Sequence, residues 1–92
     1  MDNIEALTHA TEKGFSCKAK HIKSVYVKEV FQGKTAWQGL VEVFELKDHP
    51  KALTAYGWSF EKGEKTELAT VLGIPPINDP QSAVQSYVAG NH

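Results

Sequence analysis

The sequence predicts an α+β fold of order α-β-β-β-β-α, with a four-stranded antiparallel sheet and both terminal helices packed on one face of it. Two observations support this. Two pairs of segments rich in β-branched and aromatic residues are each joined by a short turn that contains glycine, as in β-hairpins. Segments with helix-type capping and spacing flank them, at Asp2–Lys13 and Pro80–Ala89. We therefore expect a single domain that spans residues 1–92.

The first predicted helix lies within residues 1–14. Asp2 is suited to cap its start, with Glu5 three positions later as in a capping box, and Gly14 is suited to end it. Its apolar positions form only a narrow stripe, made of Ile4, Leu7 and either Ala10 or Thr11. A stripe this narrow indicates that the helix docks loosely.

A long hairpin is expected next, with arms at Ile22–Phe31 and Thr35–Leu46. Gly33 at the first central position of a two-residue Gly33-Lys34 loop favours a type II′ turn. In this register, the expected facing pairs are Val30 with Trp37, Val27 with Leu40, and Tyr26 with Val41. The turn therefore fixes which side chains share a face.

Both faces of this predicted hairpin are about half apolar. One face would carry Val25, Val27, Phe31, Ala36, Leu40, Phe44 and Leu46. The other would carry Ile22, Tyr26, Val30, Trp37, Val41 and Val43. A sheet covered on one side should instead show one polar face. Either a bulge near Lys28-Glu29 changes the alternation, or both faces are partly covered, and the sequence leaves both alternatives open.

The second predicted hairpin starts with an aromatic stripe, because Tyr56, Trp58 and Phe60 alternate with small residues. Gly63 lies in its turn. The returning arm, Thr66–Gly73, places Leu68 and Leu72 on one face and Ala69 and Val71 on the other. The preceding residues 50–54 are compatible with one helical turn or with a loop.

The last predicted helix has a strong start, since Asp79 can cap it and Pro80 suits its first position. Its apolar residues recur at helical spacing, at Ala83, Val84, Tyr87 and Val88. We therefore expect this helix to dock on the sheet.

Composition argues against several functional classes. The ten basic residues are all Lys, against 11 acids, for a net charge of −1. Because bidentate recognition of phosphate or guanine is normally performed by Arg, specific nucleic-acid binding is disfavoured. Cys17 is the only cysteine, so an intrachain disulfide is impossible. The uncharged stretch Leu68–Asn78 contains two prolines and is too short to span a bilayer. We expect a soluble, cytoplasmic protein without a signal peptide, membrane partner, metal or cofactor.

Six residues are candidates for a binding site. Lys20 and Lys28 belong to a lysine-rich strip that either solvates a strand edge or attracts anions beside Tyr26 and Trp37. His49 lies at a strand-to-turn junction, where sites are common, and Trp58 could line a cavity or belong to the core. No catalytic residue is indicated.

Three functional hypotheses follow. The leading one is a non-enzymatic binding or assembly module that forms a homodimer through a sheet face or an edge strand. The first alternative is a weak binder of single-stranded nucleic acid that uses Lys20, Tyr26, Lys28 and Trp37. The second is a small enzyme or ligand-binding protein with a pocket near His49 and Trp58.

Overall fold

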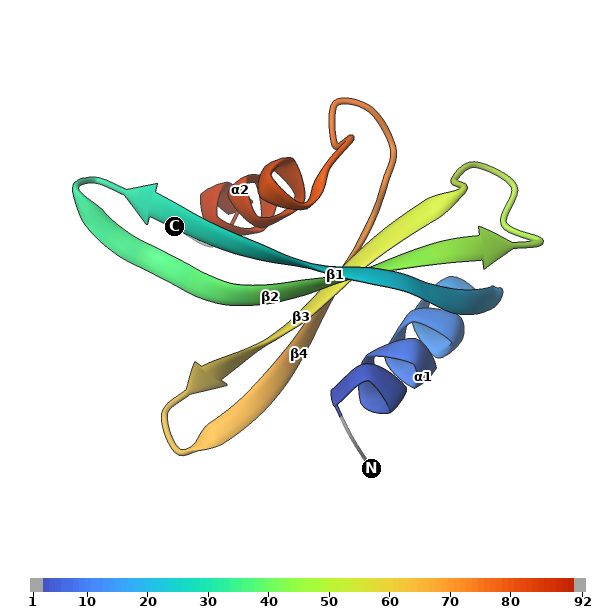
Figure 1. Cartoon of the computed structure of the whole chain (residues 1–92), viewed down its shortest axis with the longest axis horizontal. Helices are drawn as coiled ribbons and strands as arrows, with labels where there is room; N and C mark the ends of the chain where they lie inside the picture. The colour runs from blue at the N-terminus through green and yellow to red at the C-terminus, as the bar shows by residue number, and fades with distance from the viewer. Residues whose placement is uncertain (1–2, 91–92) are drawn as a thin grey trace.

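The computed structural model describes residues 3–90 and has the predicted α+β order (Figure 1). The elements are α1 (Asn3–Phe15), β1 (Lys18–Phe31), β2 (Lys34–Lys47), β3 (Thr54–Lys62), β4 (Lys65–Leu72) and α2 (Pro80–Gly90). The four strands form one sheet in the order β1-β2-β3-β4, and each neighbouring pair is antiparallel. The predicted fold class and order of elements are therefore confirmed.

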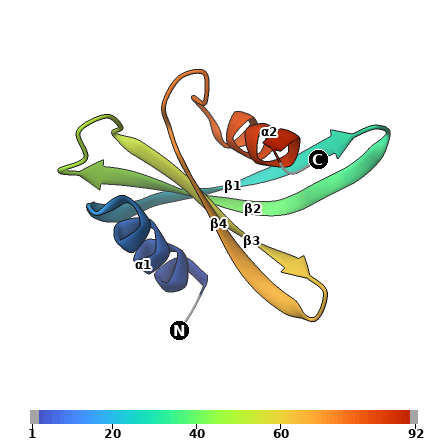
Figure 2. The ribbon, with the colours of Figure 1, turned by 180° about the vertical axis from the view of Figure 1, so that it is seen from behind.

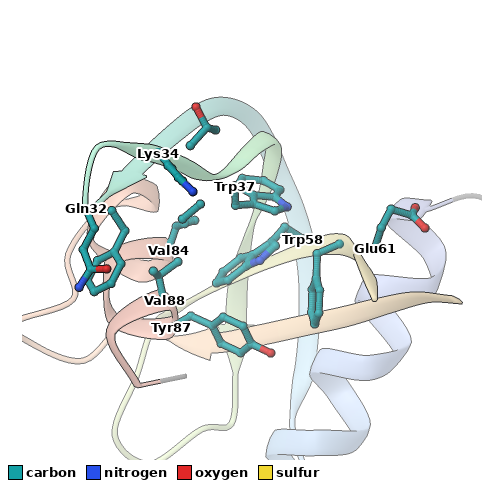
Figure 3. A pocket seen from close by; sticks show the side chains of 12 residues that line it. Gln32, Lys34, Trp37, Trp58, Glu61, Val84, Tyr87 and Val88 are labelled. Atoms are coloured by element: carbon teal, nitrogen blue, oxygen red, sulfur yellow. The ribbon is translucent and has the colours of Figure 1, made fainter. Parts of the chain in front are cut away.

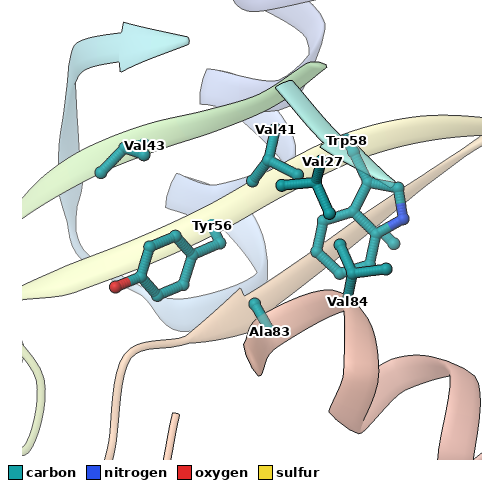
Figure 4. Close-up of a cluster of buried hydrophobic side chains, with 8 residues drawn as sticks. Val27, Val41, Val43, Tyr56, Trp58, Ala83 and Val84 are labelled. Carbon is teal, nitrogen blue, oxygen red and sulfur yellow. The ribbon is translucent and has the colours of Figure 1, made fainter. Parts of the chain in front are cut away.

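The two helices cover opposite faces of the sheet, so the expectation that they share one face is wrong (Figures 1 and 2). Val41–Phe44 on β2 and Ala55–Trp58 on β3 are buried at four consecutive positions each, which requires cover on both sides. One core cluster joins α2 to one face, through Ala83, Val84, Val41, Val43, Tyr56 and Trp58 (Figure 4). The other joins Leu7 of α1 to Phe44, Leu46, Ala52 and Ala55. Cover on both sides explains why both faces of the predicted hairpin are half apolar.

Helix α1 is packed on the sheet through Leu7 and Thr11, both of which are fully buried. The buried Thr11 hydroxyl donates a hydrogen bond to the Leu7 carbonyl at 2.8 Å. Close approach depends on Gly57 of β3, since a Cβ there would lie 3.1 Å from Leu7 Cδ2. Two buried side chains and one glycine thus dock a helix whose apolar stripe is narrow.

The ends of α1 differ from the prediction. The expected cap, Asp2, lies outside the described residues. The helix runs through Gly14 to Phe15, and Ser16 takes the left-handed conformation, with φ of +54°. Glu12 then holds the following strand, because its Oε2 accepts a hydrogen bond from Ala19 N at 3.0 Å.

The turn of the first hairpin is Gln32-Gly33, and the predicted turn at Gly33-Lys34 is wrong. Both central residues have positive φ, +54° and +79°, as in a type I′ turn. This turn pairs Phe31 with Lys34 rather than with Ala36, which is a shift of two residues. The irregularity between Glu29 and Val30 reduces the shift to one, so that Tyr26 faces Leu40 rather than Val41. The register also shifts between His21 and Lys23 and between Glu29 and Val30, close to the bulge considered from the sequence.

The second hairpin follows the prediction. Gly63 has φ of +65° in its turn. Ala69 lies opposite Trp58 on the α2 side of the sheet, and Leu72 lies opposite Ala55 on the α1 side. The two hairpins are joined by a short ladder, in which Glu42–Glu45 pair with Thr54–Gly57. Beyond this ladder β2 and β3 diverge (Figure 1).

Residues 48–53 form a loop, without a helical turn. His49 organises this loop, because its Nδ1 accepts hydrogen bonds from Lys51 N at 3.1 Å and Ala52 N at 3.0 Å. Its ring also makes an edge contact with Phe15, at a centroid distance of 6.4 Å. His49 is therefore a turn-stabilising residue at the end of α1.

Asp79 caps α2 as predicted, with Pro80 as the first helical residue. Asp79 Oδ1 accepts from Ser82 N at 2.7 Å, and Ser82 Oγ accepts from Asp79 N at 3.1 Å. These reciprocal bonds form a capping box in which Ser replaces the usual Glu or Gln. They orient α2 so that Ala83 and Val84 meet the sheet.

We expect this cap to make stability depend on pH in acid. The hydrogen bonds from Ser82 hold the pKa of the Asp79 carboxyl below its ordinary value. A carboxyl with a lowered folded-state pKa contributes stability above its unfolded pKa, and that contribution is lost as the pH falls through the folded-state pKa. Asp79→Asn keeps an acceptor but cannot titrate, so its melting temperature should fall less than that of the parent between about pH 5 and about pH 2.

Circular dichroism melts at a series of pH values measure this difference. Ser82→Ala, which removes the hydroxyl but keeps the carboxyl, should also reduce the acid-dependent loss. Identical acid profiles in the parent and in both variants would contradict the role given to this cap.

Candidate functional site

A cavity of about 520 Å³ opens where the two hairpins diverge, between the tip of the β1–β2 hairpin, β3 and α2 (Figure 3). We call it the aromatic cleft. It is lined by Phe31, Gln32, Lys34, Thr35, Ala36, Trp37, Trp58, Phe60, Glu61, Val84, Tyr87 and Val88. Three elements that are distant in the sequence therefore contribute to one concave surface.

Four aromatic rings form a continuous wall of this cleft. The centroid of the Trp58 ring lies 5.9 Å from that of Trp37 and 5.5 Å from that of Tyr87, and Tyr87 lies 5.8 Å from Phe60. The period of two along β3 directs Trp58 and Phe60 to the α2 side, where Tyr87 meets them. Tilted and edge-to-face pairs of this kind stabilise one another while leaving apolar surface toward the cavity.

Trp37 bridges the diverging strands. Its Nε1 donates to the carbonyl of Ser59 on β3 at 3.1 Å. The indole lies over Gly39 of its own strand, where a Cβ would come within 3.0 Å of Trp37 Cζ2. Gly39 also has φ of +156°, which side chains rarely adopt. The bare backbone at Gly39 thus allows the indole to reach across to β3.

The polar groups of the cleft are unevenly placed. Lys34 extends from the hairpin tip toward Val84 and Trp37, whereas Glu61 points away from the cavity (Figure 3). Gln32 and Thr35 add an amide and a hydroxyl at the same end as Lys34. The cleft therefore combines apolar walls with one cationic group near its mouth.

A second, more open hollow of about 800 Å³ lies on the α1 side of the sheet. Trp37, Phe60 and Glu61 line both hollows, so the two are opposite sides of one gap between β2 and β3. Glu42 also lines the second hollow and is only 3% exposed. Its Oε1 accepts hydrogen bonds from His21 Nε2, at 2.8 Å, and from Ser24 Oγ.

Glu42 is therefore a buried acidic side chain held by two hydrogen-bond partners. Both partners bond to the same oxygen of Glu42, so no Ser–His–carboxylate relay is formed. Glu42 is not among the six candidate residues predicted from the sequence. The sequence feature that could have identified Glu42 is a single acidic residue between Val41 and Val43 in an otherwise apolar run, at a position that faces α1.

Of the six candidate residues, only Trp37 and Trp58 lie next to one another in the structure. Trp58 is 1% exposed and belongs to the core as well as to the cleft wall. Tyr26 is 62% exposed and faces Leu40, and Lys20 and Lys28 are exposed on β1. Tyr26 follows Val25, whose partner Val41 lies in the α2-side core, so Tyr26 points to the opposite face from that core and from Trp37. His49 does not line the cavity at Trp58.

Cys17 does not have the environment of an activated nucleophile. Burial, with the nearby charges of Glu12 and Asp48, raises the pKa of its thiol above the ordinary value. A nucleophilic cysteine requires the opposite shift. Within residues 3–90, His, Cys, Asp and Glu side chains form no group of three that could hold a metal ion.

Comparison of the chain with protein-family models, curated proteins and solved structures gave no match. No helix in the described part of the chain is long and apolar enough to cross a membrane.

Proposed function

We propose that the protein is a non-enzymatic binding module whose ligand is a small planar aromatic molecule that carries one anionic group. The continuous wall of four aromatic rings in the aromatic cleft is the observation that supports this most directly. This proposal retains the binding-module hypothesis and places its ligand at Trp58, as one of the alternatives did.

The size of the cleft suits such a ligand. Its volume of about 520 Å³ lies within the range of roughly 300–1,000 Å³ that is usual for small-molecule sites. A flat aromatic ring can stack on or meet the edges of the half-buried rings of Trp37, Phe60 and Tyr87, and it removes their remaining apolar surface from water.

The charge distribution of the cleft indicates which polar group the ligand carries. Lys34 extends toward the apolar floor, where its ammonium can pair with a carboxylate or sulfonate. Gln32 and Thr35 offer further hydrogen bonds at the same end. A cationic ligand would be repelled by Lys34, and a neutral one would lack the charge-assisted bond.

Intrinsic fluorescence provides the test, because both tryptophans of the chain lie in the cleft wall. Titration with 2-naphthoate should change their emission in a saturable way. The neutral analogue 2-naphthamide should bind about two- to fivefold more weakly, because Lys34 is exposed and an exposed ion pair contributes up to about 1 kcal/mol.

Lys34→Gln should remove this preference for the anion and leave 2-naphthamide binding unchanged. Lys51→Gln, which removes an exposed lysine in the loop at the opposite end of β2 and β3 and outside the cleft lining, is the matched control and should behave like the parent. Absence of saturable binding of either probe, or equal loss of naphthoate affinity in the two variants, would contradict the proposal.

The same proposal places the module in the cytoplasm, because its single cysteine has no intrachain disulfide partner. Self-association through a sheet face or an edge strand, the other expectation from the sequence, is tested separately by the mass of the protein in solution.

A further inference from the structure

We infer that two copies of the chain associate through the outer edges of their β1 strands, which pair antiparallel about a two-fold axis at Tyr26. In the part of the chain that the structure describes, β1 pairs with β2 alone and has a second edge available. The dimer would contain a continuous eight-stranded sheet, made from the four strands of each copy. This inference is independent of the aromatic cleft.

The regular part of β1 is symmetric about Tyr26. The register with β2 shifts between His21 and Lys23 and again between Glu29 and Val30. Between these irregularities, Lys23–Glu29 pair without interruption, and Tyr26 is the central residue of this stretch. A regular strand segment that is centred on one residue can pair with its own copy about that residue.

The outward backbone groups suit this pairing. The Lys28 carbonyl accepts a hydrogen bond from Gln81 Nε2 of α2 at 3.2 Å. Because inward and outward groups alternate along an antiparallel strand, this bond from outside the ladder indicates that the groups of Ser24, Tyr26 and Lys28 point to the free edge. A carbonyl oxygen has two lone pairs, so Lys28 can accept from the second copy as well.

The side chains are complementary in this register. Tyr26 would meet Tyr26 of the second copy, and Val25 would meet Val27. Lys23 would lie opposite Glu29 on the face that α2 covers, twice in each dimer, so that opposite charges pair across the interface. Glu29 is already oriented there by Gln81 Nε2, which lies 2.6 Å from its Oε2.

The exposed apolar surface beside this edge also fits a second copy. Tyr26, Val30 and Leu40 are 62%, 52% and 52% exposed, and Leu40 is the direct cross-strand partner of Tyr26. These residues lie on the hairpin beyond the region that α1 covers. Pairing at Tyr26 places the two Tyr26 side chains next to one another, so that each shields part of the other from water.

Sedimentation equilibrium over a range of concentrations tests the inference. The parent should show a mass of about twice 10.2 kDa at tens of micromolar. Lys23→Glu and Glu29→Lys should each weaken the dimer by about tenfold or more, because each places like charges opposite one another at two symmetric positions. The double variant restores both charge pairs and should return the dissociation constant to near the parent value.

Two further variants complete the design. Tyr26→Asp changes an exposed residue, so it should give a monomer that is still folded and melts cooperatively. Lys62→Glu makes the same charge change far from β1 and should dimerise like the parent. A parent that is monomeric throughout, a double variant as weak as the single ones, or equal effects of Lys23→Glu and Lys62→Glu would overturn the inference. Naphthoate titration of the Tyr26→Asp monomer tests the proposed cleft ligand separately.

Discussion

Replacement of Trp58 by alanine is expected to lower the free energy of unfolding by about 3–5 kcal/mol. Trp58 is 1% exposed, and its ring contacts Trp37 and Tyr87. Its removal leaves a cavity where β3 meets α2, and the surrounding structure can close such a cavity only in part. Urea unfolding followed by circular dichroism measures the change and does not depend on the lost fluorophore.

Leu53→Ala serves as the control, because Leu53 is 79% exposed. Its effect should stay within about 0.5 kcal/mol, as for most surface substitutions. If Trp58→Ala lowered the free energy of unfolding by an equally small amount, Trp58 would not be a central residue of the core.

Truncation of the chain after Asn78 is expected to abolish folding. It removes α2, whose Ala83 and Val84 are fully buried against the sheet. Each buried valine contributes about 1.5–3 kcal/mol, and the face beneath α2 would expose Val41, Tyr56 and Trp58 to water. The combined loss approaches the whole stability of a typical domain, about 5–15 kcal/mol.

Circular dichroism and size-exclusion chromatography of the truncated chain should show an unfolded or aggregating species. The full-length variant Gln85→Ala/Ser86→Ala changes only exposed residues of α2 and should fold normally. A cooperative thermal transition of the truncated chain near the parent midpoint would mean that the sheet folds without α2.

The features that the sequence predicts correctly are local. The capping of α2 by Asp79 depends on residues within one turn, and the faces of Leu72 and Val71 follow from strand alternation after a short loop. Local hydrogen bonding and side-chain periodicity are encoded over a few neighbouring residues, so one sequence suffices to identify them.

The register of the first hairpin was less predictable. Gly33 suits the first central position of a type II′ turn and the second of a type I′ turn, and only Gln32 decides between them. Gln32 adopts a left-handed conformation that its residue type does not favour. The different turn and the irregularity between Glu29 and Val30 together changed the expected partner of Tyr26 and of the other paired residues in the arm.

The placement of the helices and the cleft was beyond local reasoning for a different reason. Gly57 allows α1 to approach the face opposite α2, but a glycine in a strand does not indicate which element will contact it. The cleft exists because β2 and β3 separate after a short ladder, which brings Lys34 and Tyr87 to one cavity. Trp37 and Trp58 could be singled out from the sequence, whereas their meeting could not.

The position of the two helices on opposite faces has a consequence for solvent exchange. The backbone amides of the short ladder between Glu42–Glu45 and Thr54–Gly57 lie between α1 on one side and α2 on the other. Exchange of these amides with deuterium requires the loss of the contacts with both α1 and α2. They should therefore exchange last, by global unfolding. Amides near Gln32-Gly33 and Gly63, at the exposed hairpin tips, should exchange by local fraying. The slowest-exchanging centre of this protein is therefore its shortest strand ladder.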